Sequence, residues 1–116
     1  MNKEVLLVRE VDPQEALQRQ RAGALVVDLR EPHEWARGHV EGAEHISLDD
    51  LPVRLRDGVL PREGEILFIC ASGNRSLNAA ALAAQTGYRN VASVAGGTSA
   101  WAQLGLPIEG GGLAGP

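Results

Sequence analysis

Short apolar runs recur along this chain and are separated by segments that carry helix-start and helix-stop signals. Two of the runs, residues 24–29 (ALVVDL) and 65–69 (EILFI), show no regular alternation with polar residues. Apolar runs of this length are typical of strands buried on both faces, as in a parallel sheet. Shorter runs predict further strands at residues 5–9, 44–47 and 91–94.

Helix signals fill the intervals between these predicted strands. Asp12 followed by Pro13 and Glu15 marks a helix start, because Asp is a good N-cap and Pro is tolerated at the first helical position. This helix is expected to end near Arg21, before Gly23. The other expected helices cover residues 32–36, 49–55, 76–85 and 98–104.

The alternation of strands and helices predicts an α/β fold in which a sheet with parallel pairing lies between helices. A chain of 116 residues has room for one domain, which we expect over residues 1–108. Residues 109–116 (EGGGLAGP) contain four glycines and are expected to form a flexible tail. Ligands of such sheets bind beyond the carboxyl ends of the strands, so the residues that follow 24–29 and 65–69 are candidates for chemistry.

Composition narrows the possible functions. The formal net charge of -4 argues against a dedicated nucleic-acid binder, which is usually basic. A single cysteine allows no internal disulfide bond, and with three scattered histidines it argues against a structural zinc site. The apolar run at residues 5–8 is too short for a signal-peptide core or a membrane span. We therefore expect a cytoplasmic protein without nucleic-acid or membrane partners.

The single cysteine, Cys70, directly follows the predicted strand at residues 65–69, and a predicted helix begins shortly after it. Free backbone N–H groups at a helix start favour negative charge, and Gly73 permits the positive φ of a tight loop. Arg75 adds a permanent positive charge. Together these features predict a lowered pKa for the Cys70 thiol and a loop that can hold an anion such as thiosulfate or phosphate. The alternative is a buried, inert cysteine.

Three blocks of sequence resemble the rhodanese family. Residues 70–75 (CASGNR) are similar to the active-site loop of single-domain rhodaneses. Residues 28–43 (DLREPHEWARGHVEGA) resemble the first signature of the family, and residues 96–107 (GGTSAWAQLGLP) resemble its last. The blocks occur in the order and at the spacing of the family, and the resemblance covers residues 8–108.

This resemblance implies a three-layer rhodanese-like sandwich and a sulfurtransferase activity. Cys70 would attack the outer sulfur of a small anionic donor and hold that sulfur as a persulfide, until cyanide, a thiol or a protein cysteine removes it. No metal or organic cofactor is implied. The residues expected to bind the donor or stabilise the persulfide are Ala71, Ser72, Gly73, Asn74, Arg75 and Ser76.

Polar residues of the first block have structural interpretations. Asp28 and Arg30 are interpreted as an ion pair that holds the strand end and the active-site loop, rather than as catalytic groups. The resemblance gives His39 a structural role, with its ring bonded to the backbone. The acidic residues Glu31 and Glu34 are interpreted as part of a solvated face.

Two features of the loop bear on its substrate. Four residues separate Cys70 from Arg75. In the phosphatases and arsenate reductases that resemble this family, the corresponding loop is longer by one residue, and this difference argues against phosphatase activity. Ala71 stands where thiosulfate-preferring members often have a basic residue, and the loss of a cation should weaken binding of a dianion. A protein-borne persulfide is therefore a rival donor. A sulfur-carrier or binding module that acts with a protein partner is the alternative function.

Overall fold

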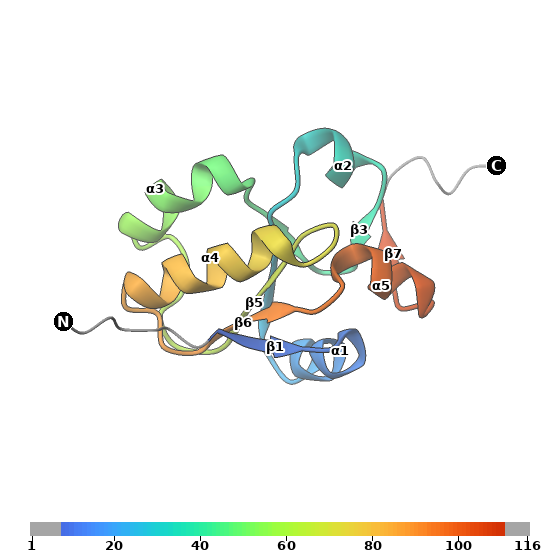
Figure 1. Ribbon diagram of the computed structural model, residues 1–116, viewed down its shortest axis with the longest axis horizontal. Coiled ribbons are helices and arrows are strands. Elements are labelled where there is room, and N and C mark those ends of the chain that lie inside the picture. Colours follow the sequence, from blue (N-terminus) through green and yellow to red (C-terminus); the bar gives the residue numbers. More distant parts are fainter. Residues whose placement is uncertain (1–7, 111–116) are drawn as a thin grey trace.

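The computed structural model describes residues 8–110, in which a twisted central sheet carries helices on both faces (Figure 1). Within these residues the sheet has five strands in the order β1-β6-β5-β2-β4, and every neighbouring pair is parallel. The strands are β1 (Arg9–Val11), β2 (Leu25–Asp28), β4 (Glu44–His45), β5 (Ile66–Ile69) and β6 (Val91–Val94). The predicted α/β class with a mostly parallel sheet is confirmed.

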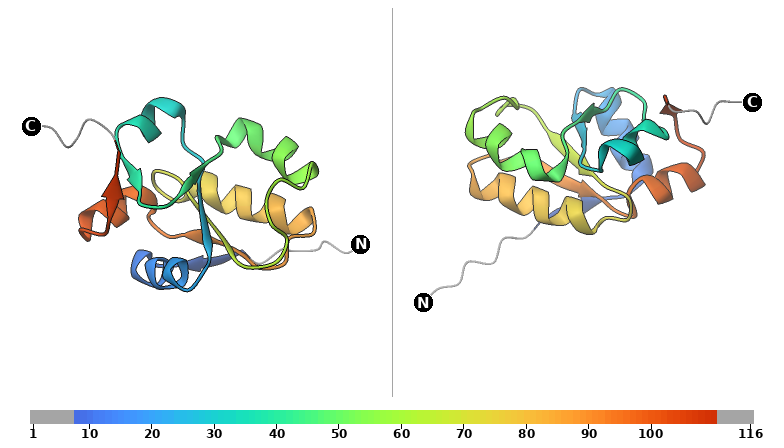
Figure 2. Two further views of the ribbon diagram at one scale, coloured as in Figure 1. Left: turned by 180° about the vertical axis from the view of Figure 1, so that it is seen from behind. Right: turned by 90° about the horizontal axis from the view of Figure 1, so that it is seen from above.

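Helices connect the strands and cover the sheet on both sides, as the two views of Figure 2 show. The helices are α1 (Pro13–Arg21), α2 (Pro32–Ala36), α3 (Leu51–Arg56), α4 (Asn74–Gln85) and α5 (Gly97–Gln103), and a 3₁₀ turn, η1 (Leu48–Asp50), precedes α3. Among the described residues, no helix is long and apolar enough to cross a membrane.

The two long apolar runs become strands that are buried on both faces, as their composition predicts. Alternate side chains of β2 and β5 point to opposite sides of the sheet. Val27 and Phe68 belong to a hydrophobic cluster on the side of α3 and α4, whereas Val26 and Leu67 belong to a second cluster with residues of α1 and α5. The molecule therefore has three layers, with the sheet between two helical layers.

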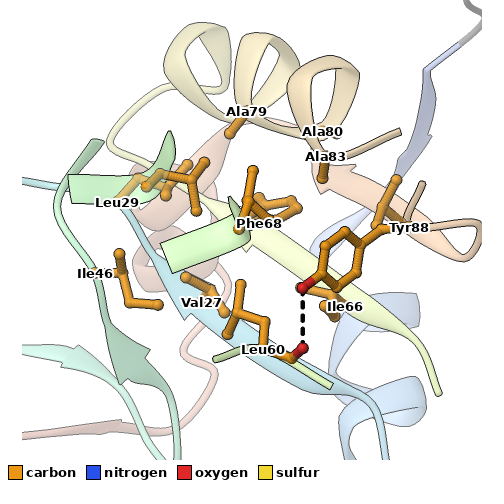
Figure 3. Packing of buried hydrophobic residues seen from close by; sticks show 13 residues of the cluster. Val27, Leu29, Ile46, Leu60, Ile66, Phe68, Ala79, Ala80, Ala83 and Tyr88 are labelled. Atoms are coloured by element: carbon orange, nitrogen blue, oxygen red, sulfur yellow. Dashed lines mark hydrogen bonds between the residues drawn. The ribbon is translucent and has the colours of Figure 1, made fainter. Parts of the chain in front are cut away.

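The larger hydrophobic cluster lies between the sheet and the helices α3 and α4 (Figure 3). Phe68 and Ile66 from β5 meet small residues of α4, among them Ala83, so the helix lies close to the sheet. Tyr88 is buried at one end, and its hydroxyl donates a hydrogen bond of 3.0 Å to the Leu60 carbonyl oxygen. This bond satisfies the polar atom that the buried ring brings into the core.

The start of α1 follows the predicted capping pattern. Asp12 is the N-cap, and its side chain accepts a hydrogen bond of 2.8 Å from the Glu15 amide. Pro13 occupies the first turn, where its missing N–H removes no helical hydrogen bond. The helix ends at Arg21, as expected from the position of Gly23.

Several boundaries differ from the predicted ones because tertiary pairing sets them. The strand expected at residues 5–9 is β1 (Arg9–Val11), whose register is set by pairing with β6; residues 5–7 lie outside the described residues. The helix expected at residues 76–85 begins two residues earlier, since Gly73 provides its N-cap with a φ of 109°.

A second, two-stranded sheet was not predicted from the sequence. In it β3 (His39–Val40) pairs antiparallel with β7 (Ile108–Glu109). Glu109, the first residue of the expected tail, therefore belongs to a strand, whereas residues 111–116 of that tail lie outside the described residues. Each strand has only two residues, which is too short for a period-two pattern to be recognised.

Candidate active site

The loop at the carboxyl end of β5 brings the single cysteine to the edge of the sheet. Cys70 directly follows β5, and α4 begins at Asn74, so the loop wraps back on itself within a few residues. β5 lies between β6 and β2 in the sheet, and the loop therefore meets segments that follow both neighbouring strands. In Figure 1 this loop, between β5 and α4, lies beside the start of α5.

Backbone amides of the loop point at the Cys70 sulfur. The Gly73 amide donates to Sγ at 3.2 Å, and the Ser76 amide donates at 3.3 Å. The Ser76 hydroxyl oxygen lies 3.4 Å from Sγ. The positive φ of Gly73 makes this geometry possible, because it turns the chain so that both amides face inward.

Burial and hydrogen bonding act on the pKa of Cys70 in opposite directions. Burial raises the pKa, because Cys70 exposes 1% of its surface and desolvation penalises the thiolate. Hydrogen bonds from Ser76 and from the amides of Gly73 and Ser72 lower the pKa. The hydrogen bonds prevail, so the pKa of the Cys70 thiol lies below its ordinary value, in the direction that the sequence predicts.

A second buried serine stands behind the first. Ser93, at 0% exposure in β6, places its hydroxyl oxygen 2.7 Å from that of Ser76, which also lies 3.1 Å from the Gly73 carbonyl oxygen. A serine hydroxyl has one proton to donate. When Ser76 donates to a Cys70 thiolate, Ser93 can donate to Ser76 and complete the chain of hydrogen bonds. Sequence analysis did not find Ser93, because a serine inside an apolar strand carries no motif.

The start of α5 binds two backbone carbonyl groups of the same loop. The Thr98 amide donates to the Cys70 carbonyl oxygen at 2.8 Å, and the Ser99 amide donates to the Ala71 carbonyl oxygen at 3.1 Å. These bonds hold two carbonyl oxygens away from the sulfur. Gly97 makes the contact possible, since a Cβ there would stand 2.2 Å from the Cys70 carbonyl oxygen.

Arg75 is engaged by an acidic residue of α2. Its Nη1 lies 3.1 Å from Glu34 Oε1, and its Nη2 lies 3.3 Å from Oε2. The hydrogen bond from Arg75 lowers the pKa of Glu34, and the same bond raises the pKa of Arg75. The interpretation of Glu34 as part of a solvated face is therefore wrong, because the fold brings α2 against the loop.

Asp28 and Arg30 form a buried ion pair beside the loop. Arg30 Nη2 lies 2.8 Å from Asp28 Oδ2 and 2.8 Å from the Gly38 carbonyl oxygen. Asp28 is the last residue of β2, and the pair thereby ties the strand end to the turn before β3. The predicted ion pair is present, whereas its role in holding the active-site loop stays a prediction.

His39 has a backbone hydrogen bond and an aromatic neighbour. Its Nδ1 lies 3.0 Å from the Trp35 carbonyl oxygen, and its ring stacks on the Trp35 ring with centroids 3.4 Å apart. His45 stacks on Trp35 as well, at 4.7 Å. These contacts join α2 to β3 and β4, and the structural role of His39 stays a prediction.

The remaining residues of the loop face outward to different degrees. Ala71 is half-buried, whereas Ser72 and Asn74 are exposed. The fold thus gathers Gly73, Ser76 and the Ser72 amide around the sulfur and turns Arg75 toward α2. A groove of about 620 Å³ lies between α5, β7 and the segment around Gly38; its lining includes Arg30 and Thr98 and no residue from 70 to 76.

Comparison with known proteins is consistent with this geometry. A family model described as "Rhodanese-like domain" matches residues 12–104. A protein of Allochromatium vinosum named sulfurtransferase is 36% identical over 104 residues, or 88% of this chain and 95% of that protein. A Pseudomonas entomophila protein named thiosulfate sulfurtransferase GlpE is 36% identical over 93 residues, or 80% of this chain and 84% of that protein. The crystal structure of a rhodanese-related protein from Thermoplasma volcanium has a TM-score of 0.80 at 30% identity, covering 87% of this chain and 97% of that chain.

Proposed function

This chain belongs to the rhodanese-like domain family and is a rhodanese-type sulfurtransferase, and from that premise we propose that Cys70 carries the transferred sulfur as a persulfide. The observation that carries the proposal is the set of amides directed at its sulfur, from Gly73 at 3.2 Å and Ser76 at 3.3 Å. Amides in these positions stabilise a thiolate before the reaction and a negatively charged persulfide after it.

The first half-reaction loads the cysteine. The Cys70 thiolate attacks the outer sulfur of thiosulfate, a new S–S bond forms, and the S–S bond of thiosulfate breaks. Sulfite leaves with the electron pair of the broken bond, and Cys70 keeps one sulfur as Cys–S–S⁻. A persulfide donor reacts in the same way and leaves as a thiolate. The step requires no general base, because the attacking species is the thiolate.

The second half-reaction unloads the cysteine. Cyanide or a thiolate acceptor attacks the outer sulfur of the persulfide, and the Cys70 thiolate leaves. The products are thiocyanate or a new persulfide on the acceptor. The amides of the loop stabilise the negative charge in both half-reactions, so one set of donors serves the whole cycle. Loading and unloading in separate steps predict ping-pong kinetics.

The intermediate is tested by intact mass after incubation with thiosulfate or a small persulfide. The wild-type protein is expected to gain one sulfur atom, which cyanide removes, whereas the Cys70→Ser variant gains none. A gain of mass on Cys70→Ser, or continued sulfur transfer by that variant, would contradict the role of Cys70. A persulfide that forms but moves only to a protein acceptor would favour the sulfur-carrier function over thiosulfate:cyanide turnover.

The proposed setting is a reducing compartment such as the cytoplasm. The only cysteine must be a free thiolate to accept sulfur, and a reducing compartment keeps it in that state. The proposed partners are a small anionic sulfur donor and a thiol or protein-cysteine acceptor.

A further inference from the structure

The positive charge of the loop is matched by a negative charge on α2. Both nitrogens of the Arg75 fork face the two carboxylate oxygens of Glu34, at 3.1 Å and 3.3 Å. The side chains are partly buried, with 33% of Arg75 and 25% of Glu34 exposed. Pairing of this kind removes much of the attraction that Arg75 would have for an incoming anion, because the pair has no net charge.

The Glu34 carboxylate is held in place from its own helix. Its Oε1 accepts a hydrogen bond of 2.8 Å from the Glu31 amide at the start of α2. Glu31 and Glu34 occupy the two positions of a capping box, and the Glu34 amide donates to the Glu31 carbonyl oxygen at 2.9 Å. The Glu34 carboxylate is therefore held by the backbone of its own helix as well as by Arg75.

The charge balance at the loop bears directly on the donor. Thiosulfate brings two negative charges to a thiolate, and Ala71 supplies no cation beside that thiolate. Arg75 is the only basic side chain from residue 70 to residue 76, and Glu34 occupies it. A donor with a single negative charge experiences less repulsion at such a site.

We propose that Glu34 determines which donor charge the loop accepts, by holding Arg75 and so disfavouring dianions such as thiosulfate relative to singly charged sulfane donors, the class to which ionised persulfides belong. This inference rests on the proposed function of Cys70. Glu34 is a specificity-determining residue that acts through Arg75. If the pair only fastened α2 to the loop, its loss would affect both kinds of donor equally.

Two small donors differ in charge but transfer the same kind of sulfur atom. Thiosulfate and methanethiosulfonate deliver the same kind of outer sulfur, but a methyl group in the second replaces one charged oxygen. Their leaving groups are sulfite and methanesulfinate, respectively. The quantity to measure is the ratio of kcat/KM for thiosulfate to that for methanethiosulfonate, with cyanide as the acceptor and at low ionic strength, where charge effects are largest.

Glu34→Gln removes the charge and keeps the cap, because Gln can also serve in a capping box. We expect the ratio of kcat/KM for thiosulfate to that for methanethiosulfonate to rise by about fivefold to tenfold, since Arg75 then faces a neutral amide. The rise should come mainly from a lower KM for thiosulfate, and it should become smaller as salt is added. A thermal melt of the variant checks that α2 has kept its place.

Two further variants identify the origin of the effect. Glu63→Gln changes the net charge by the same amount at an exposed site before the amino end of β5, whereas the Cys70 loop follows its carboxyl end, and is expected to leave the ratio unchanged. In an Arg75→Ala background, Glu34→Gln is expected to change the ratio by less than about twofold, because the partner through which it acts is gone.

The outcomes separate this inference from the function on which it rests. If the wild-type protein loads sulfur on Cys70 but Glu34→Gln leaves the ratio unchanged, or if Glu63→Gln changes it as much, the inference is wrong and the proposed function stands. If the wild-type protein loads sulfur on Cys70 from neither of these donors nor from a small persulfide, the proposed function is wrong, and the inference that rests on it is wrong as well.

Discussion

At the scale of single residues, Ser76 contacts the Cys70 sulfur twice: its amide donates to Sγ, and its hydroxyl oxygen lies 3.4 Å from Sγ, where it can donate once the thiol is ionised. Replacing Ser76 with Ala removes the hydroxyl and keeps the amide. We expect the pKa of Cys70 to rise, because burial raises this pKa and one of the hydrogen bonds that lower it is lost. Sulfur loading at pH 7 should fall about tenfold, as for the loss of one hydrogen bond to a charged group. The pH dependence of alkylation by iodoacetamide measures the change in pKa directly.

Ser93 provides the matched comparison, because its hydroxyl is bonded to Ser76 and belongs to a different strand. Ser93→Ala should change the alkylation profile in the same direction and by less, since Ser76 remains and loses only the donor behind it. A profile that is displaced more by Ser93→Ala than by Ser76→Ala would contradict this order of the hydrogen-bond chain.

At the scale of elements, the junction between β6 and α5 shapes the loop without supplying a side chain to the sulfur. Gly97→Ala would place a Cβ 2.2 Å from the Cys70 carbonyl oxygen, at a φ of +60°. We expect the loop to shift and sulfur loading to fall by more than tenfold, with a loss of about 1–3 kcal/mol of stability from backbone strain. Mass-detected loading and urea unfolding measure the two effects separately.

Gly105 is the control for that substitution. It also has a positive φ, of +72°, but a Cβ there would meet nothing within 4 Å. Gly105→Ala should therefore cost a similar amount of stability and leave loading close to that of the wild-type protein. Equal loss of loading in both variants would mean that backbone strain around α5, and not the clash with Cys70, disturbs the site.

The sequence predicts those parts of the site that lie within one local segment. Cys70, Gly73 and Ser76 are close along the chain, and a strand, a glycine and a helix start mark their positions. Glu34 and Ser93 reach the loop only through the order of the strands, which sets β2 and β6 on either side of β5. Hydrophobic pattern predicts that strands exist, but it does not say which of them are neighbours.

The same reason explains which elements were predicted. α1, α2 and the two long strands carry strong local signals, since caps and apolar runs are properties of a few adjacent residues. The pairing of β3 with β7 joins His39 to Glu109, far apart in the chain, through two residues on each side. The sequence of β3 or of β7 alone does not indicate which segment it pairs with.

At the scale of the whole molecule, the ionisation of Cys70 couples to folding. Its pKa is lowered in the folded state, so the folded protein is already deprotonated at pH values at which the unfolded chain still holds the proton. The stability that this supplies is lost as pH falls through the folded pKa and is fully present above the unfolded pKa. Between these two values, the free energy of unfolding should rise with pH.

The Cys70→Ser variant supplies the reference, because serine does not ionise in this range. The difference in free energy of unfolding between wild type and Cys70→Ser should grow in favour of the wild type as pH approaches about 8.5, the ordinary value for cysteine. Urea unfolding across this range measures the difference. A difference that moved against the wild type as pH rose would mean that burial of the sulfur prevails over its hydrogen bonds.

The pinned carbonyl groups of Cys70 and Ala71 have a consequence for how such a domain can diversify. Backbone amides face the sulfur together with the buried Ser76 hydroxyl, whereas the side chains of Ser72 and Asn74 are exposed, so a change in these two side chains removes none of those groups. We therefore expect substitutions of Ser72 and Asn74 to alter what the outer surface of the loop contacts and to leave sulfur loading close to that of the wild-type protein.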